Sequence, residues 1–480
     1  MNNYVTVLER RLKSVLDQIV LAEDSSVLVE IPGGVESPPL IATSSRLGST
    51  ARLPKAPEKL NDSCLEALRL QLREPVLTSD LLDDVESLLR HAELRRKRIA
   101  GHSSRIERMC VVAHCALVLA EAFHRTNDPR YLNAALKLMD APSLRVFSHL
   151  CALRLRKRPT LQVVRVVSAQ VSIGGGMRRV SRQDWQPDRP LLSADPNSGS
   201  PAKEVSPFPP DARIVVLSPN NYSLYSLSVL QLAEQAQATV VGVAVRTFTA
   251  RRFKEEFARD GTRLLAKIWR KAVLRRRSYP SDHVFGTLAD YCSSIGVRES
   301  SVSEWAQGRG VPYWMCGSLN DPDLVKAIAE TNPDLVIFTG GGLIREQLLS
   351  ASRCGVMNMH MGILPWYRGM DVVEWPVLEG YPNRTGYSVH LMVRGLDEGP
   401  ILSTAHMPAM SMGSVKDLRM LMESFAPSAI VSTARDLLEG DLSPQSQQKE
   451  EGRQYFVMHR ALRQIVDSRF ADYAASRKDG

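Results

Sequence analysis

Helical spacing of apolar residues dominates the first third of the chain. Between about residues 58 and 155, leucines recur three and four positions apart, which predicts amphipathic helices. Asp80 stands at the start of one of these runs and is its expected N-cap. Residues 109–123 are apolar on nearly every side, as is typical of a helix buried among other helices. With another helix expected over residues 1–25, this part of the chain predicts a helical accessory domain.

The pattern changes after residue 211, where short apolar runs alternate with amphipathic segments. Residues 213–218 (RIVVLS), 239–245 (TVVGVAV) and 334–340 (DLVIFTG) are apolar runs of strand length. Apolar strands that alternate with helices indicate a mostly parallel sheet covered on both faces, which is the α/β class. Ligands of such sheets bind beyond the carboxyl ends of the strands.

A stretch rich in Gly, Ser and Pro separates the two patterns. After a predicted strand over residues 161–172, the chain runs through GGG, DPNSGSPAK and SPFPP. The sequence therefore predicts a helical domain over 1–160, a strand and linker over 161–211, an α/β domain over 212–440 and a short C-terminal extension over 441–480.

The positive charge of the chain is concentrated in one insert. The 480 residues carry a formal net charge of +9. Residues 246–277 alone hold twelve Arg and Lys and three acidic residues, within a predicted basic helical insert over 246–278. Such a run could bind phosphates or anionic lipid. An amphipathic insert that packs on its own domain and exposes its basic face is the more ordinary interpretation, and we favour it.

Cysteine usage and hydropathy indicate a reducing compartment. The seven cysteines form no Cys-x-x-Cys pair, which disfavours a zinc module and a disulfide framework. The first twenty residues place charges among the apolar ones, unlike a signal peptide, and no apolar stretch reaches the length of a membrane span. We therefore expect a cytoplasmic protein without a membrane span.

Candidate chemistry begins at the strand-like segment VMNMH. Asn358 and His360 are two residues apart, so alternation directs both side chains to one face of the strand. His390 lies in a later apolar run, and Asp397 follows it in a loop. Imidazole and carboxylate groups suit acid–base chemistry, and His360, His390 and Asp397 could also bind a metal ion. No spacing rule alone joins these residues.

A family resemblance joins them. The segment NMHMGILPWYRG (358–369), followed by His390 and LDEGPIL (396–402), resembles the formyltransferase family that uses 10-formyltetrahydrofolate. That family includes the methionyl-tRNA, glycinamide ribonucleotide and amino-sugar enzymes. The resemblance covers about residues 212–440 and implies a Rossmann-like domain that works without metal. Gly362 departs from the pattern, because a Ser usually stands two positions after the family's His.

The resemblance implies the roles of three side chains. Transfer of a formyl group to an amine passes through a tetrahedral intermediate whose oxygen gains negative charge. Asn358 would donate to this oxygen, and His360 would donate to it and carry a proton. Asp397 would orient His360, favour its charged form and relay protons through water. The nucleophile is the substrate's own amine.

The resemblance also implies a folate site, and the loops suggest acceptor contacts. Pterin sites of this family are lined by backbone from two loops. The predicted cofactor-binding residues are Gly342, Leu343, Ile344, Leu364, Val393, Arg394, Gly395 and Leu396. The loop SPNNYSLYS after the first strand offers polar side chains, while Arg368 is either a loop anchor or a substrate contact. The predicted substrate-binding residues are Asn220, Asn221, Ser223 and Arg368.

The acceptor is expected to be a small amine. The initiator-tRNA enzymes of the family carry a β-barrel domain of about a hundred residues after the catalytic domain, and the purine enzymes lack the insert and the helical domain. The sequence therefore favours an amino-sugar nucleotide over nucleic acid. Five alternatives stay open: an N-hydroxyornithine-like acceptor, a methionyl-tRNA acceptor, hydrolysis of 10-formyltetrahydrofolate, a non-catalytic adaptor, and an enzyme that reads RNA through the insert. Assembly into a homo-oligomer is also left open.

Overall fold

The computed structural model describes part of the chain in two compact units. The first unit groups residues 1–181 with 456–465, and the second groups 182–455 with 466–480. The described residues are 65, 68, 70–72, 74, 76–94, 105–126, 128–139, 201–247, 287–407, 414–448 and 451–476.

A seven-stranded sheet forms the centre of the second unit. Its strand order is β3-β2-β1-β4-β5-β7-β8, and the first five of these strands are parallel. β7 and β8 extend the sheet in antiparallel pairing. This topology confirms the expected mostly parallel, Rossmann-like sheet. The strands are β1 (Arg213–Ser218), β2 (Thr239–Arg246), β3 (Tyr313–Cys316), β4 (Leu335–Phe338), β5 (Val356–His360), β7 (Gly386–Leu391) and β8 (Ile401–His406).

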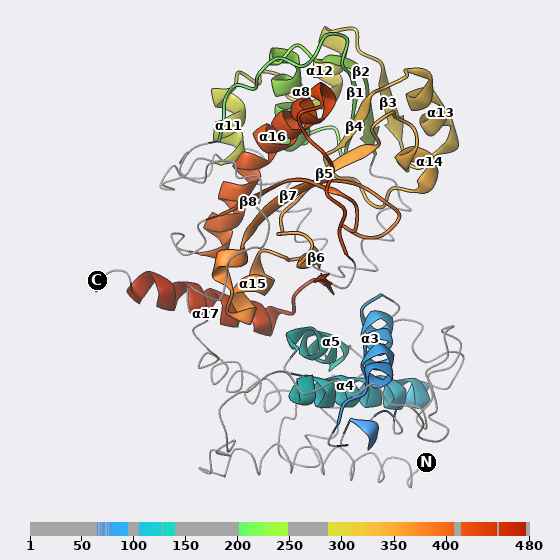
Figure 1. The fold of residues 1–480 in the computed structure, drawn as a ribbon, viewed down its shortest axis with the longest axis vertical. Helices are drawn as coiled ribbons and strands as arrows, with labels where there is room; N and C mark the ends of the chain where they lie inside the picture. Colours follow the sequence, from blue (N-terminus) through green and yellow to red (C-terminus); the bar gives the residue numbers. More distant parts are fainter. Residues whose placement is uncertain are drawn as a thin grey trace. The chain divides into compact units, whose positions relative to one another are not determined.

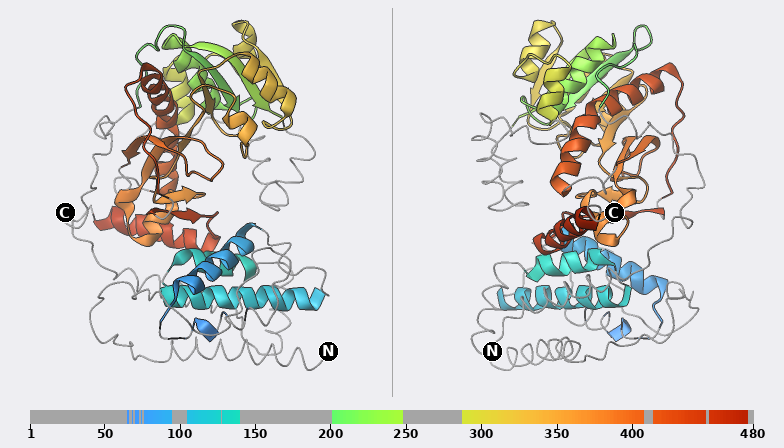
Figure 2. Two further views of the ribbon diagram at one scale, coloured as in Figure 1. Left: turned by 45° about the vertical axis from the view of Figure 1, so that its right-hand side comes forward. Right: turned by 90° about the vertical axis from the view of Figure 1, so that its left-hand side faces the viewer.

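Helices cover both faces of this sheet (Figures 1 and 2). α13 and α14 lie on one face, where Leu324, Ile328 and Leu348 join a buried apolar cluster with side chains of β1, β2 and β4. α8, α11, α12 and α16 lie on the other face. The helices are α8 (Leu224–Gln235), α11 (Leu288–Ser294), α12 (Val302–Gly308), α13 (Pro322–Glu330), α14 (Glu346–Leu349), α15 (Glu374–Glu379), η2 (Pro382–Arg384) and α16 (Val415–Glu439).

A second, two-stranded sheet lies after β5. β6 (Tyr367–Gly369) pairs in parallel with β9 (Arg453–Tyr455), so the segment after α16 returns to the stretch that follows β5. The aromatic rings of Tyr367 and Tyr455 are stacked with centroids 5.2 Å apart. Both phenolic hydroxyls donate to the carboxylate of Glu379, at 2.9 and 2.8 Å. The sequence pattern did not predict this pairing.

Three helices of the first unit are described: α3 (Ser79–Leu94), α4 (Arg105–Thr126) and α5 (Pro129–Met139). They fall where helical spacing predicted helices. Asp80, however, is not the N-cap of α3. The helix begins at Ser79, and the Thr78 hydroxyl accepts the Leu81 amide at 3.3 Å, so Asp80 lies in the first turn.

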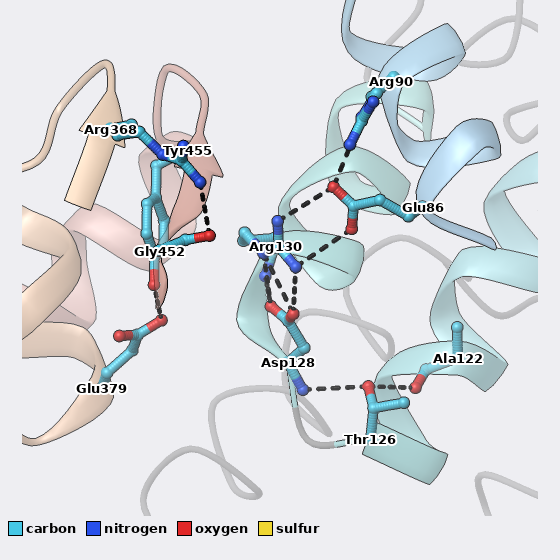
Figure 3. Close-up of polar contacts among 10 residues, drawn as sticks. All are labelled: Glu86, Arg90, Ala122, Thr126, Asp128, Arg130, Arg368, Glu379, Gly452 and Tyr455. Carbon is cyan, nitrogen blue, oxygen red and sulfur yellow. Dashed lines mark hydrogen bonds and ion pairs between the residues drawn. The ribbon is translucent and has the colours of Figure 1, made fainter. Parts of the chain in front are cut away.

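Polar contacts link these helices with each other and with the segment 456–465. Arg130 forms ion pairs with Asp128 at 2.7 Å and with Glu86 at 3.1 Å (Figure 3). The buried Asn133 amide donates to the Val457 carbonyl at 3.2 Å and accepts the His459 amide at 2.6 Å. The last helix, α17 (Arg460–Ser476), begins directly after this anchored stretch.

Several expectations fall outside the described residues. They are the helix over 1–25, the strand over 161–172, most of the 161–211 linker and nearly all of the basic insert over 246–278. The proposed domain boundaries therefore stay predictions. Within the described part of the chain, no helix is long and apolar enough to cross a membrane.

Candidate active site

Strands β5 and β7 present four polar side chains on one face of the sheet. Asn358 and His360 alternate with buried methionines along β5. In the antiparallel pairing with β7, Asn358 lies opposite His390 and His360 lies opposite Ser388. Directly opposed residues project from the same face. The expectation that Asn358 and His360 share a face agrees with this register.

Two acceptors flank the His360 ring. Its Nε2 atom lies 2.8 Å from the backbone oxygen of Tyr367 and donates to it, which directs Nδ1 toward Asp397. Nδ1 is 3.6 Å from the Asp397 Oδ2 atom. At this distance Asp397 acts on Nδ1 through its charge and not through a hydrogen bond. The ring is 7% exposed, which holds it in this position.

Asp397 is held over the strand face by its own loop. Its Oδ2 atom accepts the Gly369 amide at 2.9 Å, and its Oδ1 atom lies 3.7 Å from His390 Nε2. The backbone of Asp397 has a φ of 53°, so the loop turns sharply at this residue. The chain thus folds back to bring His360 and Asp397, 37 positions apart, into one cluster.

His390 completes the cluster as a buried neutral base. Its Nδ1 atom donates to the Leu391 carbonyl at 3.0 Å, and its Nε2 atom accepts from the Asn358 amide at 3.2 Å. Burial lowers the pKa of His390 to about 4, a positive charge on His360 adds to this shift, and Asp397 opposes it. The Asn358 amide has two N–H donors. One binds His390, and the second can bind a substrate oxygen.

The lowered pKa of His390 predicts a loss of stability in acid. An unfolded histidine has a pKa near 6.5, so between about pH 6.5 and pH 4 protons bind the unfolded chain better than the folded one. Stability is therefore complete above pH 6.5 and falls toward pH 4, by up to about 3 kcal/mol.

Denaturant unfolding at a series of pH values measures this effect. His406 also has a pKa lowered by burial and acts in the same direction, so the variant His390→Gln isolates the contribution of His390. We expect a flatter pH dependence in this variant. An unchanged slope would assign the acid sensitivity to other groups.

Comparison with known proteins identifies the domain that carries this cluster. The sequence model of the family described as "Formyl transferase" matches residues 212–434. Residues 212–434, the formyl transferase domain, are thus similar to this family. The match contains Asn358, His360, His390 and Asp397.

Curated relatives of the formyl transferase domain share its sequence over part of their length. The methionyl-tRNA formyltransferase of Caldanaerobacter subterraneus subsp. tengcongensis is 29% identical over 32% of this chain and 50% of its own length. The enzyme of the same name from Rhodopirellula baltica is 36% identical over 24% of this chain and 34% of its own length. That of Anaeromyxobacter dehalogenans is 30% identical over 36% and 58%. The chain thus spans about half the length of the curated relatives it matches.

Solved structures that resemble the chain carry related names. Glycinamide ribonucleotide transformylase 1 from Symbiobacterium toebii has 19% identity and a TM-score of 0.33, and the match covers 50% of this chain and 95% of that chain. An N-formyltransferase from Helicobacter canadensis, crystallised with folinic acid and dTDP-3-aminofucose, has 13% identity and a TM-score of 0.30 over 51% and 71%.

The predicted cofactor-binding residues of the formyl transferase domain lie mainly on two loops. Gly342, Leu343 and Ile344 follow β4, the parallel neighbour of β5, and Leu343 is 78% exposed. The other loop, between β7 and β8, exposes the apolar side chains of Val393 and Leu396. Leu364 instead is buried, and its amide donates to the Ser388 hydroxyl at 3.0 Å. The members of the second loop are Val393, Arg394, Gly395 and Leu396.

The predicted substrate-binding side chains all have partners within the second unit. Asn220 accepts the Tyr222 amide at 2.9 Å, and Ser223 caps α8. Asn221 accepts from Ser303 and from the Tyr313 hydroxyl, and also donates to the Ser303 hydroxyl. Arg368 donates to the Gly452 carbonyl at 2.7 Å and lies 3.6 Å from a Glu398 oxygen, as the loop-anchor interpretation expects (Figure 3). Their contact with substrate stays a prediction.

Gly362, the departure from the family pattern, lies against His360. A Cβ atom at this position would be 2.8 Å from His360 Nε2, from the Tyr367 carbonyl oxygen and from a methyl group of Val372. A side chain here would therefore press on the hydrogen bond that orients the His360 ring. The absence of the family's Ser thus permits the observed ring position.

Restoring the family residue is expected to impair this chain. In Gly362→Ser, crowding of this kind costs about 1–3 kcal/mol of unfolding free energy, and kcat falls because the His360 ring is displaced. Thermal unfolding and steady-state kinetics measure both effects. Gly308→Ser is the matched control, since no described atom outside its own helix and chain neighbours lies within 4 Å of a Cβ atom there. Equal behaviour of the two variants would contradict the prediction.

Proposed function

We propose that the formyl transferase domain transfers a formyl group from 10-formyltetrahydrofolate to an amine through Asn358, His360 and Asp397. The observation that carries this proposal is the cluster itself. A buried imidazole stands between a carbonyl and a carboxylate, beside an amide donor, within the stretch that matches the family. The roles assigned to the three side chains are those that the family resemblance implies.

The chemistry needs a donor for oxygen and a path for a proton. The acceptor nitrogen attacks the formyl carbon, a C–N bond forms, and the formyl oxygen gains negative charge. The Asn358 amide and the Nδ1–H group of His360 would donate to this oxygen. The 3.6 Å separation of Nδ1 from Asp397 exceeds a hydrogen bond, so charge orients Nδ1 without consuming its donor.

The proton balance of the reaction also involves Asp397. The attacking nitrogen loses one proton, the bond between the formyl carbon and N10 breaks, and N10 gains one proton as tetrahydrofolate leaves. Asp397, about a tenth exposed, would pass the proton from the amine to water, His360 would supply a proton to N10, and water would return one proton to His360. The net result moves one proton from the acceptor to the folate.

For the acceptor we propose a primary amine or hydroxylamine of a small specialised substrate, with an amino-sugar nucleotide as the leading candidate. The basic insert follows β2, whose carboxyl end neighbours that of β1 and the loop with Asn220 and Asn221. Positive charge there would attract a nucleotide diphosphate. Methionyl-tRNA is the second candidate, because the curated relatives carry that name. We further propose that the protein works in the cytoplasm.

A folate assay with a panel of acceptors tests the proposal. Release of tetrahydrofolate is followed by absorbance. The acceptors are amino-sugar nucleotides, hydroxylamine-bearing amino acids and methionyl-tRNA, each measured beside an enzyme-free control. Turnover that depends on one acceptor supports the transferase and names its substrate class. Turnover without acceptor would indicate a hydrolase, and folate binding without any turnover would indicate an adaptor.

A further inference from the structure

Strand β6 uses both of its edges. In a strand, the backbone groups of successive residues point to opposite sides. The Tyr367 carbonyl and the Gly369 amide point to one side, where they bind His360 Nε2 and the Asp397 carboxylate. The Trp366 carbonyl and the Met370 amide point to the other side, where they bind Arg453 and Tyr455 of β9. One three-residue strand thus connects the His360–Asp397 pair with the segment after α16.

Close packing fixes β9 on β6. A Cβ atom at Gly369 would lie 2.1 Å from the Tyr455 carbonyl oxygen, so the two backbones approach as closely as glycine allows. Arg368 donates to the Gly452 carbonyl at 2.7 Å (Figure 3). Tyr455 is 3% exposed, and its ring packs against those of Tyr367 and Trp375. The position of β6, and of the groups that it offers His360 and Asp397, therefore depends on β9.

The same segment also holds the loop that carries Asp397. The Gln447 side-chain amide donates to the Asp397 carbonyl at 3.1 Å and to the Gly399 carbonyl. Just before it, Gln445 and Ile401 exchange backbone hydrogen bonds at 2.8 Å in both directions. Gln447 thus contacts Asp397 directly, and β9 acts on the Asp397 carboxylate through β6.

We propose that Gln445, Gln447 and residues 452–455 form a positioning element of the active site, with Gln447 as its principal positioning side chain. The element lies beyond residue 434, where the family match ends. This proposal rests on the proposed function, because the positioning of His360 and Asp397 has a kinetic consequence only if these residues carry out formyl transfer. Gln447 holds the loop that carries Asp397 in position next to β5. β9 holds the Tyr367 carbonyl and the Gly369 amide of β6 in position.

The variant Gln447→Met tests the proposal. It keeps a similar side-chain length and removes the donor to both carbonyls. We expect kcat to fall about tenfold, because the loop that carries Asp397 loses both of its hydrogen bonds to Gln447, with KM for the acceptor unchanged within about twofold. Gln448→Met is the control, because Gln448 is the exposed neighbour.

A second readout does not depend on turnover. Nitrogen-15 NMR of ring-labelled histidine reports the tautomer and hydrogen bonds of His360, assigned with His360→Ala. We expect Gln447→Met to move the His360 ring signals and Gln448→Met to leave them in place, with thermal unfolding midpoints that show all variants folded.

These two readouts separate the possible failures. If the wild type shows no turnover with any acceptor, the proposed function fails, and the NMR arm still tests the positioning. If Gln447→Met keeps both the wild-type kcat and the wild-type His360 signals, the positioning proposal is overturned. An equal loss in Gln448→Met would also overturn it, because that loss would not come from the bonds to Asp397 and Gly399.

Discussion

Replacing His360 with alanine is expected to lower kcat by about 10²–10⁴-fold, the range for loss of a general acid–base group. The ring is the group that the structure places between the Tyr367 carbonyl and Asp397, at 2.8 and 3.6 Å. We expect KM for folate to change little, since the predicted folate contacts lie on the loops after β4 and β7. Steady-state kinetics with the acceptor found in the panel measure both constants.

A histidine outside the cluster provides the control for this prediction. His91 lies in α3 of the first unit, and its Nδ1 atom is 2.8 Å from the Ser87 carbonyl. His91→Ala should retain the wild-type kcat. A loss of less than about tenfold in His360→Ala would mean that His360 does not act in the chemical step, and an equal loss in His91→Ala would indicate a general effect of histidine removal.

Gly369→Ala is expected to give the largest loss of stability. Its φ is 105°, in the region that favours glycine, and a Cβ atom would meet the backbone of Tyr455 at 2.1 Å. Backbone strain and crowding each cost about 1–3 kcal/mol, so we expect the unfolding free energy to fall by about 3 kcal/mol. Because the Gly369 amide binds Asp397, kcat should fall as well. Denaturant unfolding and kinetics measure the two effects.

Gly380→Ala separates strain from crowding. Gly380 also has a positive φ, 88°, and among the described atoms none beyond its chain neighbours lies within 4 Å of a Cβ atom there. This variant should lose only about 1 kcal/mol and keep its activity. If the two variants lose the same stability, the contact between Gly369 and Tyr455 does not constrain the fold as described.

The sequence predicted the sheet well where apolar runs were long. β1 coincides with the predicted strand over 213–218, and β2 exceeds its prediction by one residue. Tyr313–Cys316 was missed because this edge strand has four residues and only one buried side chain. β6 and β9 are each three residues long, which is too short to show a period. Paired residues of the two strands are 86 positions apart, so their pairing has no local sequence signal.

The candidate site was predictable in part. Alternation along β5 placed Asn358 and His360 together, while Asp397 needed the family resemblance, because a loop that folds back has no spacing rule. Polar loop residues were less predictable. Asn221 resembles a substrate contact in sequence, yet the structure uses it to hold Ser303 and Tyr313. Gln447 gave no sequence signal, because a single amide can bind any nearby carbonyl.

The most direct test of the central claim follows the formyl carbon itself. The protein is incubated with 10-formyltetrahydrofolate carrying carbon-13 in the formyl group, together with the acceptor panel, and the label is located by NMR. We expect the label to appear in an N-formyl amide of one acceptor. We expect the variants Asn358→Ala and His360→Ala to transfer little of the label. Label released only as formate, or label that stays on the folate with every acceptor, would contradict it.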